Sequence, residues 1–310
     1  MPNSLVYSVS IVIPNYNGES LLPKHLPNVI KQSPGVEIII VDDASTDGSV
    51  TMLAEKFPTV KVLALKQNSR FAAACNAGFA AAKGDIVVLL NSDVSPRSGY
   101  LPPLLTHFSD PLVFSVGSKE IEEVSGQKVD SGRGLGAFRR GLVVHWRPDN
   151  QTEKSTLWTT GGSMAVSKKI WLEMGGMDTL FKPAYWEDIE MCYRAQKRGY
   201  KVIFEPKSVV EHHHETTNMA ALGKPVMNVA AFKNQLLFIW RDITDASYIV
   251  SHLLWLPYHL IVTSYRTKGL FLQGFYKALL QLPQALRARR AEKPFAVISD
   301  HDILIYQSGD

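Results

Sequence analysis

Blocks of consecutive apolar residues alternate with segments of helical apolar spacing along the first ninety residues of the chain. The apolar blocks predict strands over 8–13, 36–41, 60–65 and 86–90. The segments between them predict helices over 21–32, 47–57 and 71–83, with Gly84 as the C-cap of the last. Wholly apolar strands are typical of sheets covered on both faces. The alternation therefore predicts an α/β fold with a mostly parallel central sheet and helices on both faces.

The pattern loosens beyond residue 100. Further strands are predicted over 112–117, 157–166, 201–204 and 208–210, and further helices over 167–175, with Ser167 as N-cap, and over 188–198. The segment 125–141 contains five glycines and three arginines, which indicates a mobile loop. We find no internal repeat, so these elements are expected to complete a single domain over residues 1–224.

Residues 225–310 differ from the rest because their periodicity is helical from 226 to about 290. The stretch 248–262 is mostly apolar, and seven basic residues against Glu292 alone follow between Arg266 and Lys293. We favour an amphipathic region that lies at a membrane surface and meets anionic head groups. A helical subdomain packed on the first domain, or on a second copy, is the alternative. The apolar run is short for a transmembrane helix.

Composition narrows the class of protein. The chain has 310 residues, of which 45% are hydrophobic and 20% charged, with a net charge of +4, as is usual for a folded globular protein. Its two cysteines, Cys75 and Cys192, are far apart, so we expect free thiols in a reducing compartment. No leader with a basic segment and an apolar run precedes the first strand, so we expect a cytoplasmic location.

The first candidate site is Asn91-Ser92-Asp93, where the predicted strand 86–90 stops abruptly. Ligands of open α/β sheets bind in the crevice beyond the carboxyl ends of the strands. Asp93, with Asn91 two positions earlier, has the oxygen ligands that a divalent cation over a diphosphate requires. The alternative is a polar turn that merely ends the strand.

The second candidate site is the acidic segment that follows the predicted strand 36–41. Asp43 is placed to contact a ribose or a base, which we favour over a turn role. Asp47 or Thr46 is expected to cap the next helix. No GxGxxG follows the first strand, which disfavours a dinucleotide site of that type.

Two further groups carry chemistry that the sequence alone leaves open. Glu187 and Asp188 follow two aromatic residues, and a carboxylate there could act as a general base or simply stabilise the start of a helix. Glu190 and Arg194 are spaced as a surface ion pair. In His212-His213-His214, one histidine could complete a metal site at Asp93, or the run could be a solvated loop.

Taken together, six ordered motifs resemble the family 2 glycosyltransferases of GT-A fold, most closely a bacterial branch with rhamnosyltransferase-like members. They are PNYNG (14–18), VDDASTDGS (41–49), NAGFAAAKGDIVVLLNSDV (76–94), TGGSMAVSKK (160–169), GGMD (175–178) and WEDIEMCYR (186–194). The resemblance spans residues 8 to 217 and implies a GT-A domain with a C-terminal helical extension.

The resemblance also implies roles for individual residues. It gives Pro14, Tyr16, Asn17, Asp43, Asn68, Arg70, Asn76, Ser92, Gly161 and Gly162 as the nucleotide and donor-sugar contacts. Asp93 matches the second Asp of the family's metal-binding DxD, whose first Asp is replaced by Asn91. Asp188 matches the general base, with Glu187 beside it. His212 is the best match to a histidine that approaches the metal, and His214 is the second choice.

The function implied is an inverting glycosyltransferase that uses Mn²⁺ or Mg²⁺. It would move a hexosyl or deoxyhexosyl group from a UDP- or dTDP-sugar to a hydroxyl of a glycan or lipid-linked acceptor of the bacterial cell envelope. We expect a place at the inner face of the cell membrane and no nucleic-acid partner, and the sequence leaves an oligomer open. The alternatives are a sugar-phosphate nucleotidyltransferase and a catalytically silent nucleotide- or carbohydrate-binding module.

Overall fold

The computed structural model describes residues 7–213 and 222–306. Its strands are β1 (Val9–Asn15), β2 (Glu37–Asp42), β3 (Lys61–Ala64), β4 (Ile86–Leu90), β5 (Val94–Pro96), β6 (Val113–Val124), β7 (Gln127–Ser131), β8 (Arg133–Arg139), β9 (Leu142–Trp146), β10 (Trp158–Thr159), β11 (Ser163–Ser167) and β12 (Lys201–His212). Its α-helices are α1 (Leu22–Gln32), α2 (Ser49–Lys56), α3 (Phe71–Ala81), α4 (Leu101–Thr106), α5 (Lys168–Glu173), α6 (Glu187–Lys197), α8 (Lys224–Asp242), α9 (Ala246–Tyr258), α10 (Ser264–Arg266), α11 (Leu270–Glu292) and α12 (Asp300–Tyr306).

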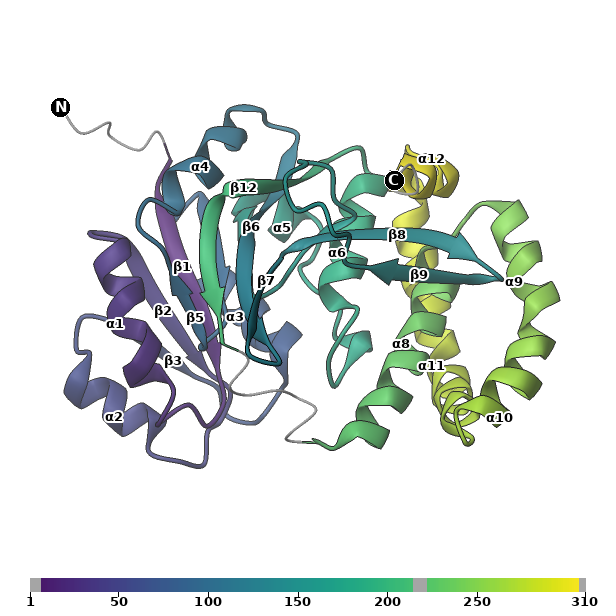
Figure 1. The fold of residues 1–310 in the computed structure, drawn as a ribbon, viewed down its shortest axis with the longest axis horizontal. Helices are drawn as coiled ribbons and strands as arrows, with labels where there is room; N and C mark the ends of the chain where they lie inside the picture. Colours follow the sequence, from purple (N-terminus) through teal and green to yellow (C-terminus); the bar gives the residue numbers. More distant parts are fainter. Residues whose placement is uncertain (1–6, 214–221, 307–310) are drawn as a thin grey trace.

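The main sheet runs in the order β3-β2-β1-β4-β11-β6-β12-β5, and β7 is added on β6. The strands from β3 to β4 are all parallel, as the apolar blocks predict. β11 lies antiparallel between β4 and β6, while β12 runs parallel to β6. Figure 1 shows this sheet with α1 and α2 beside its first strands and the C-terminal helices at the opposite side of the molecule. The α/β class is confirmed.

Alternate residues of the central strands enter two separate cores. Ile11 and Ile13 pack with α1 and α4 on one face of the sheet, whereas Val12 packs with α3, α5 and α6 on the other. This division follows from strand geometry, because successive side chains point to opposite faces. The sheet is therefore buried on both sides, and its polar residues gather where the strands end.

A third core joins the C-terminal helices to the sheet domain. It contains Phe181 and Trp186, which precede α6, and Tyr193 of α6 itself. These side chains pack against Phe238 of α8 and Phe271 of α11. Within residues 7–213 and 222–306, no helix has both the length and the apolarity to cross a bilayer. The residues after 224 thus form a helical layer packed on the first domain, which was the alternative to a membrane role in the sequence analysis.

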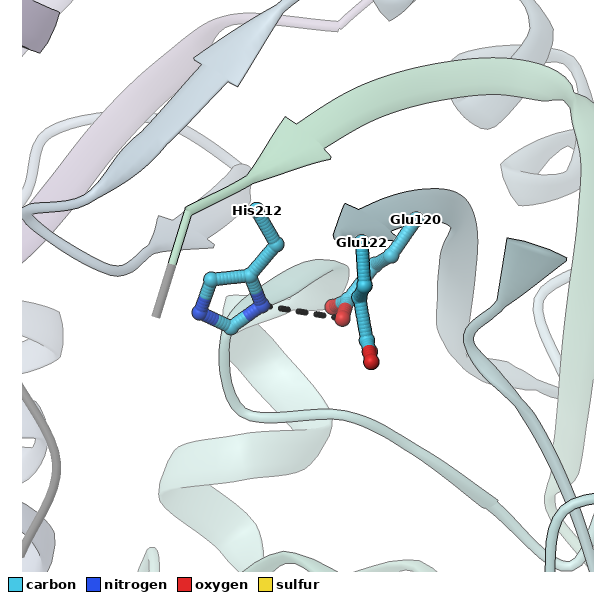
Figure 2. A group of neighbouring side chains, drawn as sticks. All are labelled: Glu120, Glu122 and His212. Carbon is cyan, nitrogen blue, oxygen red and sulfur yellow. Dashed lines mark hydrogen bonds and ion pairs between the residues drawn. The ribbon is translucent and has the colours of Figure 1, made fainter. Parts of the chain in front are cut away.

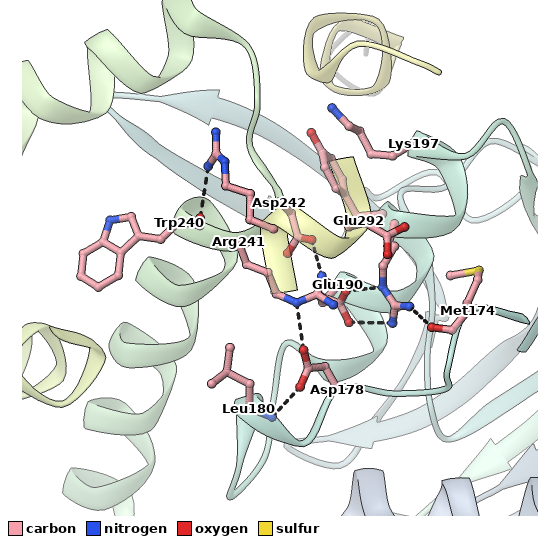
Figure 3. Close-up of polar contacts among 12 residues, drawn as sticks. Met174, Asp178, Leu180, Glu190, Lys197, Trp240, Arg241, Asp242 and Glu292 are labelled. Atoms are coloured by element: carbon pink, nitrogen blue, oxygen red, sulfur yellow. Dashed lines mark hydrogen bonds and ion pairs between the residues drawn. The ribbon is translucent and has the colours of Figure 1, made fainter. Parts of the chain in front are cut away.

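Buried charges also link this helical layer to α6. Figure 3 shows Arg241 among Asp178, Glu190 and Asp242, to all of which it donates. Glu190 also accepts from Arg194. Glu190 is fully buried, so the prediction of a surface pair with Arg194 is wrong. The helical spacing was right, but the partner helix α8 covers the pair.

The predicted mobile loop over 125–141 is also wrong, because the segment forms β7 and β8. Its glycines serve close packing: a Cβ on Gly134 would lie 2.1 Å from the ring of Trp158, and one on Gly136 would lie 2.4 Å from Leu157. Glycine inside a strand often marks such an approach. Glycine content therefore misled the prediction about mobility.

Two smaller predictions also need correction. Helix α3 ends at Ala81 with Ala82 as its C-cap, so Gly84 does not cap it. Gly84 instead lies against β1, where a Cβ would meet the backbone nitrogen of Ser10 at 2.5 Å. The strands predicted over 201–204 and 208–210 are one strand, β12, with a register shift between Glu205 and Val209.

Candidate active site

Two glycines, Gly161 and Gly162, lie where all parts of the candidate site meet. The backbone N–H of Gly161 donates to Asp188 Oδ2 at 3.1 Å, and a Cβ on this residue would lie 3.0 Å from the ring of Phe71. A Cβ on Gly162 would lie 3.0 Å from His212 and 3.1 Å from Asn91. The predicted general base, Asp188, and two predicted metal ligands, His212 and Asn91, therefore surround one short backbone segment that was itself predicted to contact the donor sugar.

Strand pairing brings Asp93 and His212 together. Asp93 lies between β4 and β5, and His212, the last residue of β12, pairs with Val94 of β5. His212 Nε2 lies 3.3 Å from Asp93 Oδ1, and its Nδ1 lies 2.9 Å from Glu120 Oε2. Figure 2 shows the His212 ring directed at the carboxylate of Glu120, which comes from β6. His214, the second choice, lies outside the described residues.

The two carboxylates keep a proton on His212. Burial alone would lower the pKa of the imidazole, but its hydrogen bonds with Asp93 and Glu120 outweigh this and raise the pKa to about 10. Burial likewise opposes ionisation of Glu120, yet the bonds from His212, Ser163 and Thr160 lower its pKa. A single positive charge thus bridges two negative ones.

This cluster has the donor atoms of a divalent cation site. Glu120, Glu122 and His212 each offer one ligand atom, and these atoms lie within 4.8 Å of one another. Carboxylate oxygens with one imidazole suit Mn²⁺. Without a metal ion, the protonated ring of His212 supplies the positive charge between the carboxylates, and it must lose a proton before it can bind a metal. The residues present therefore fit a cation, provided that His212 gives up its proton.

Glu187 and Asp188 begin α6 as a pair of unequal carboxylates. Burial raises the pKa of Glu187 to about 8, and its Oε2 has no hydrogen-bond partner among the described residues. Burial also raises the pKa of Asp188, but the backbone N–H groups of Gly161 and Ile189 donate to its two oxygens and favour its charged form. Asp188 is thus the member of the pair that ionises first.

The backbone before α6 is held in an unusual conformation. Tyr185 and Trp186 have φ values of 69° and 79°, a region that residues with side chains seldom occupy. The side-chain amide of Asn234 on α8 donates to the carbonyls of Phe181, Ala184 and Tyr185. The helical layer therefore fixes the turn that aims both carboxylates.

The polar loops that follow β1 and β2, where the donor is predicted to bind, form most of their hydrogen bonds with each other. Asp42 accepts from Asn15 and Ser45, and the Oδ1 of Asn17 accepts from the backbone N–H of Thr46 at 2.8 Å. Asp47 accepts from the backbone N–H of Ser49 at 3.0 Å, but the N-cap of α2 is Gly48, so the prediction that Asp47 or Thr46 is the cap is wrong by one or two residues. These contacts tie the loop after β1 to the loop after β2.

Asp43 has a clear structural partner in this region. Its two carboxylate oxygens accept from the backbone N–H groups of Ser69 and Arg70, both at 2.7 Å. These bonds hold the loop before α3, where Arg70 has a φ of 72°. Asp43 thus holds this loop in place, and each of its oxygens keeps a further lone pair for a ligand.

The remaining predicted donor residues lie around the same edge of the sheet. Pro14 pairs with Val41 in the β1–β2 register, Tyr16 is 47% exposed and Ser92 is half-buried. The buried Oδ1 of Asn68 has no partner among the described residues. Asn76 differs, because its amide exchanges two hydrogen bonds with the backbone of Met177. It supports a turn rather than facing the crevice.

Glu120 is the site residue that the sequence analysis missed. The predicted strand stopped at residue 117, whereas β6 continues to Val124. Val116 shares the face on which Glu120 falls, since the two are separated by an even number of steps along the strand, whereas Phe114 packs in the core on the other face. A carboxylate at an inward position of an apolar strand was the available signal.

Comparison with protein families matches residues 10–185 to the model described as Glycosyl transferase family 2. The chain is 28% identical over 220 residues to the pre-mycofactocin glycosyltransferase of Mycobacterium tuberculosis (strain ATCC 25618 / H37Rv), covering 67% of this chain and 43% of that protein. It is 26% identical over 259 residues to polypeptide N-acetylgalactosaminyltransferase 3 of Mus musculus, covering 76% and 41%. The chain thus spans less than half the length of these relatives.

Two solved structures show the same fold. GalNAc-T7 with UDP, GalNAc and Mn²⁺ has a TM-score of 0.66 and 19% identity, covering 92% of this chain and 58% of that one. The mannosyltransferase PcManGT from Pyrobaculum calidifontis, in complex with GDP-Man and Mn²⁺, has a TM-score of 0.54 and 18% identity, covering 97% and 86%. These likenesses confirm the predicted GT-A fold.

Proposed function

The chain belongs to glycosyl transferase family 2, and from this membership we propose that it is an inverting enzyme. It transfers a hexosyl or deoxyhexosyl group from a nucleoside-diphosphate sugar, such as a UDP- or dTDP-sugar, to an acceptor hydroxyl. The observation that carries the proposal is the meeting of Asp188, His212 and Asn91 around Gly161 and Gly162. The rhamnosyltransferase-like branch is part of the proposal.

In this reaction Asp188 acts as the general base. It takes the proton of the acceptor hydroxyl while the oxygen attacks the anomeric carbon from the face opposite the diphosphate, whose bond to that carbon breaks. Its partial exposure gives a hydroxyl access, and the N–H groups of Gly161 and Ile189 keep it charged. Glu187, with a raised pKa, holds the pair's remaining proton near neutral pH.

Asp93, Asn91, Glu120, Glu122 and His212 would hold a divalent cation, Mn²⁺ or Mg²⁺. Such a cation supplies electrostatic stabilisation to a departing diphosphate. In the solved relatives the corresponding ion is Mn²⁺. The loops at Asp43, Asn68 and Arg70, with Pro14, Tyr16 and Asn17, would bind the nucleotide.

The test is release of nucleoside diphosphate from a panel of nucleotide sugars with Mn²⁺, with and without acceptor extracts. Release from at least one donor, abolished by EDTA and restored by Mn²⁺, is the expected result. Products should show inverted anomeric configuration by NMR. Absence of release from every donor would instead favour a silent binding module, and pyrophosphate formation from a sugar phosphate would favour a nucleotidyltransferase.

We further propose that the acceptor is a glycan or lipid-linked molecule of the bacterial cell envelope, met at the inner face of the cell membrane. The supporting feature is an apolar exposed face on the helical layer. Leu254, Ile261 and Tyr265 are 75%, 72% and 87% exposed. Arg266 and Lys268, which are also exposed, follow directly and suit anionic head groups.

Vesicle flotation tests this membrane surface in the full chain, because removal of the helical layer would open the third core. We expect the chain to float with anionic vesicles, and Leu254→Ser with Ile261→Ser to reduce recovery severalfold. Leu172→Ser, at a residue of α5 that is 51% exposed, is the matched control. Equal flotation of all three proteins would refute the surface.

A further inference from the structure

Three lysines line one cavity, which lies between the helical layer and the turn that precedes α6. The cavity has a volume of about 210 Å³, far above the 10–15 Å³ or so that one water needs. Its walls include Lys182 of the turn, Lys233 of α8 and Lys277 of α11. The three cations come from segments far apart in the sequence, so only the fold brings them together.

None of these three lysines forms an ion pair with a carboxylate of the described residues. Lys233 is buried, and its Nζ donates to the backbone carbonyls of Leu180 and Lys182. Burial and the nearby charge of Lys277 lower the pKa of Lys233 to about 8. Such a cluster gains stability when an anion enters it.

The rest of the cavity wall is apolar and open to solvent at one side. Val226 and Leu280 line it and are 49% and 64% exposed. Gln281 also lines it, and its buried Oε1 has no hydrogen-bond partner among the described residues. Three lysines beside exposed apolar side chains are complementary to a molecule with an anionic head and an apolar chain.

The cavity adjoins the catalytic carboxylates. Lys182 lies five residues before Glu187, and the charge of Lys233 acts on the Glu187 carboxylate. Asn234, next to Lys233, holds the intervening turn. An anion held here would place its neighbouring groups near the base.

We propose that this cavity binds the phosphate of an amphiphilic acceptor, with the lysines holding the phosphate and Leu280 and Val226 contacting the lipid chain. The proposal rests on the proposed function, since it names the acceptor class of that same site. It makes Lys182 and Lys277 acceptor-binding residues, outside the donor and cation sites.

Octyl phosphate below its critical micelle concentration serves as the probe, with binding measured by calorimetry. We expect saturable binding to the wild-type chain and a loss of about tenfold or more in Lys182→Gln with Lys277→Gln, because charge-assisted hydrogen bonds disappear. Lys56→Gln, at an exposed lysine of α2 outside both the cavity wall and the proposed membrane surface, is the matched control. Equal binding to all three proteins would overturn the proposal.

A second variant separates the two sources of phosphate. Leu280→Ser should weaken octyl phosphate severalfold and leave inorganic phosphate unchanged, whereas wild-type chain should bind inorganic phosphate much more weakly than octyl phosphate. Equal affinities for the two would overturn the lipid part. Nucleotide-sugar binding and its Mn²⁺ dependence, measured on the same variants, should match wild type. Loss of donor binding in the wild-type chain itself would instead refute the proposed function.

Discussion

The donor side and the acceptor side of the candidate site are built differently. On the donor side, Asp42 and Asp43 are satisfied by loops that directly follow neighbouring parallel strands or lead into the next helix. On the acceptor side, Glu187 and Asp188 depend on a turn held by Asn234, which lies about fifty residues later. The donor side is thus a property of the sheet, whereas the acceptor side needs the helical layer.

The difference also appears in how polar groups are paired. On the donor side the buried carboxylates of Asp42 and Asp43 accept hydrogen bonds, and the buried oxygens without a partner among the described residues are the amide oxygens of Asn15 and Asn68. On the acceptor side the oxygen without a partner belongs to a carboxylate, that of Glu187. Unsatisfied buried groups cost stability and are concentrated at functional sites. The comparison teaches that, among the described residues of the candidate site, the incompletely paired carboxylate lies beside the proposed base.

The largest expected effect comes from Asp188→Asn, which removes the base and keeps the shape. Turnover should fall by about 10²–10⁴-fold, while donor affinity stays near that of wild type. Steady-state kinetics measure the turnover, and calorimetric titration with the nucleotide sugar measures the donor affinity. Asp149→Asn, at an exposed loop position, is the control and should change neither. A variant that keeps most of its turnover would remove Asp188 from the mechanism.

Arg241→Met tests the anchoring of the helical layer. It leaves Asp178, Glu190 and Asp242 facing one another without the shared cation, so we expect a loss of about 3–5 kcal/mol in the free energy of unfolding. Urea denaturation measures the loss. Lys169→Met breaks an exposed pair with Glu173 and should cost under about 1 kcal/mol. Similar losses in both variants would contradict the buried network.

Asp43→Asn tests the donor side by itself. The side-chain oxygen of the new Asn can accept from only one of the backbone N–H groups of Ser69 and Arg70, and its NH₂ group faces the other. The loop before α3 is therefore held less firmly. We expect donor affinity to fall about tenfold with turnover at saturating donor unchanged. A fall in turnover without a change in affinity would show that the two sides are not separable.

The smallest effect concerns pH and stability. The folded chain keeps a proton on Glu187 up to a pKa of about 8, whereas the unfolded chain releases it near 4.5. Raising the pH between these values therefore favours unfolding, by at most about 1.4 kcal/mol per pH unit. Glu187→Gln should flatten the fall in melting temperature between pH 6 and 8.5, while Glu153→Gln, an exposed control, should not. Parallel curves for all proteins would contradict the buried proton.

Much of the first ninety residues was predictable because its elements follow from local patterns. The apolar blocks gave strands β1 to β4 within two residues of their bounds, and Asp43 and Asp93 were found because polar residues end buried strands. The strands in the segment 125–141 were not predictable, because its glycines make room for Trp158 and Leu157, which lie about twenty residues away in the sequence. Local composition carries no information about such contacts.

The sequence by itself determined the α/β class and the family, and it supplied the residue types of the proposed donor and cation sites. These depend on the order of apolar blocks and on motifs of a few residues. The tertiary structure alone decided that Glu120 faces His212, that Arg241 buries the Glu190 pair, and that three lysines surround one cavity. Each of these pairs residues some fifty or more positions apart, or joins separate helices, and burial is a property of the packed chain.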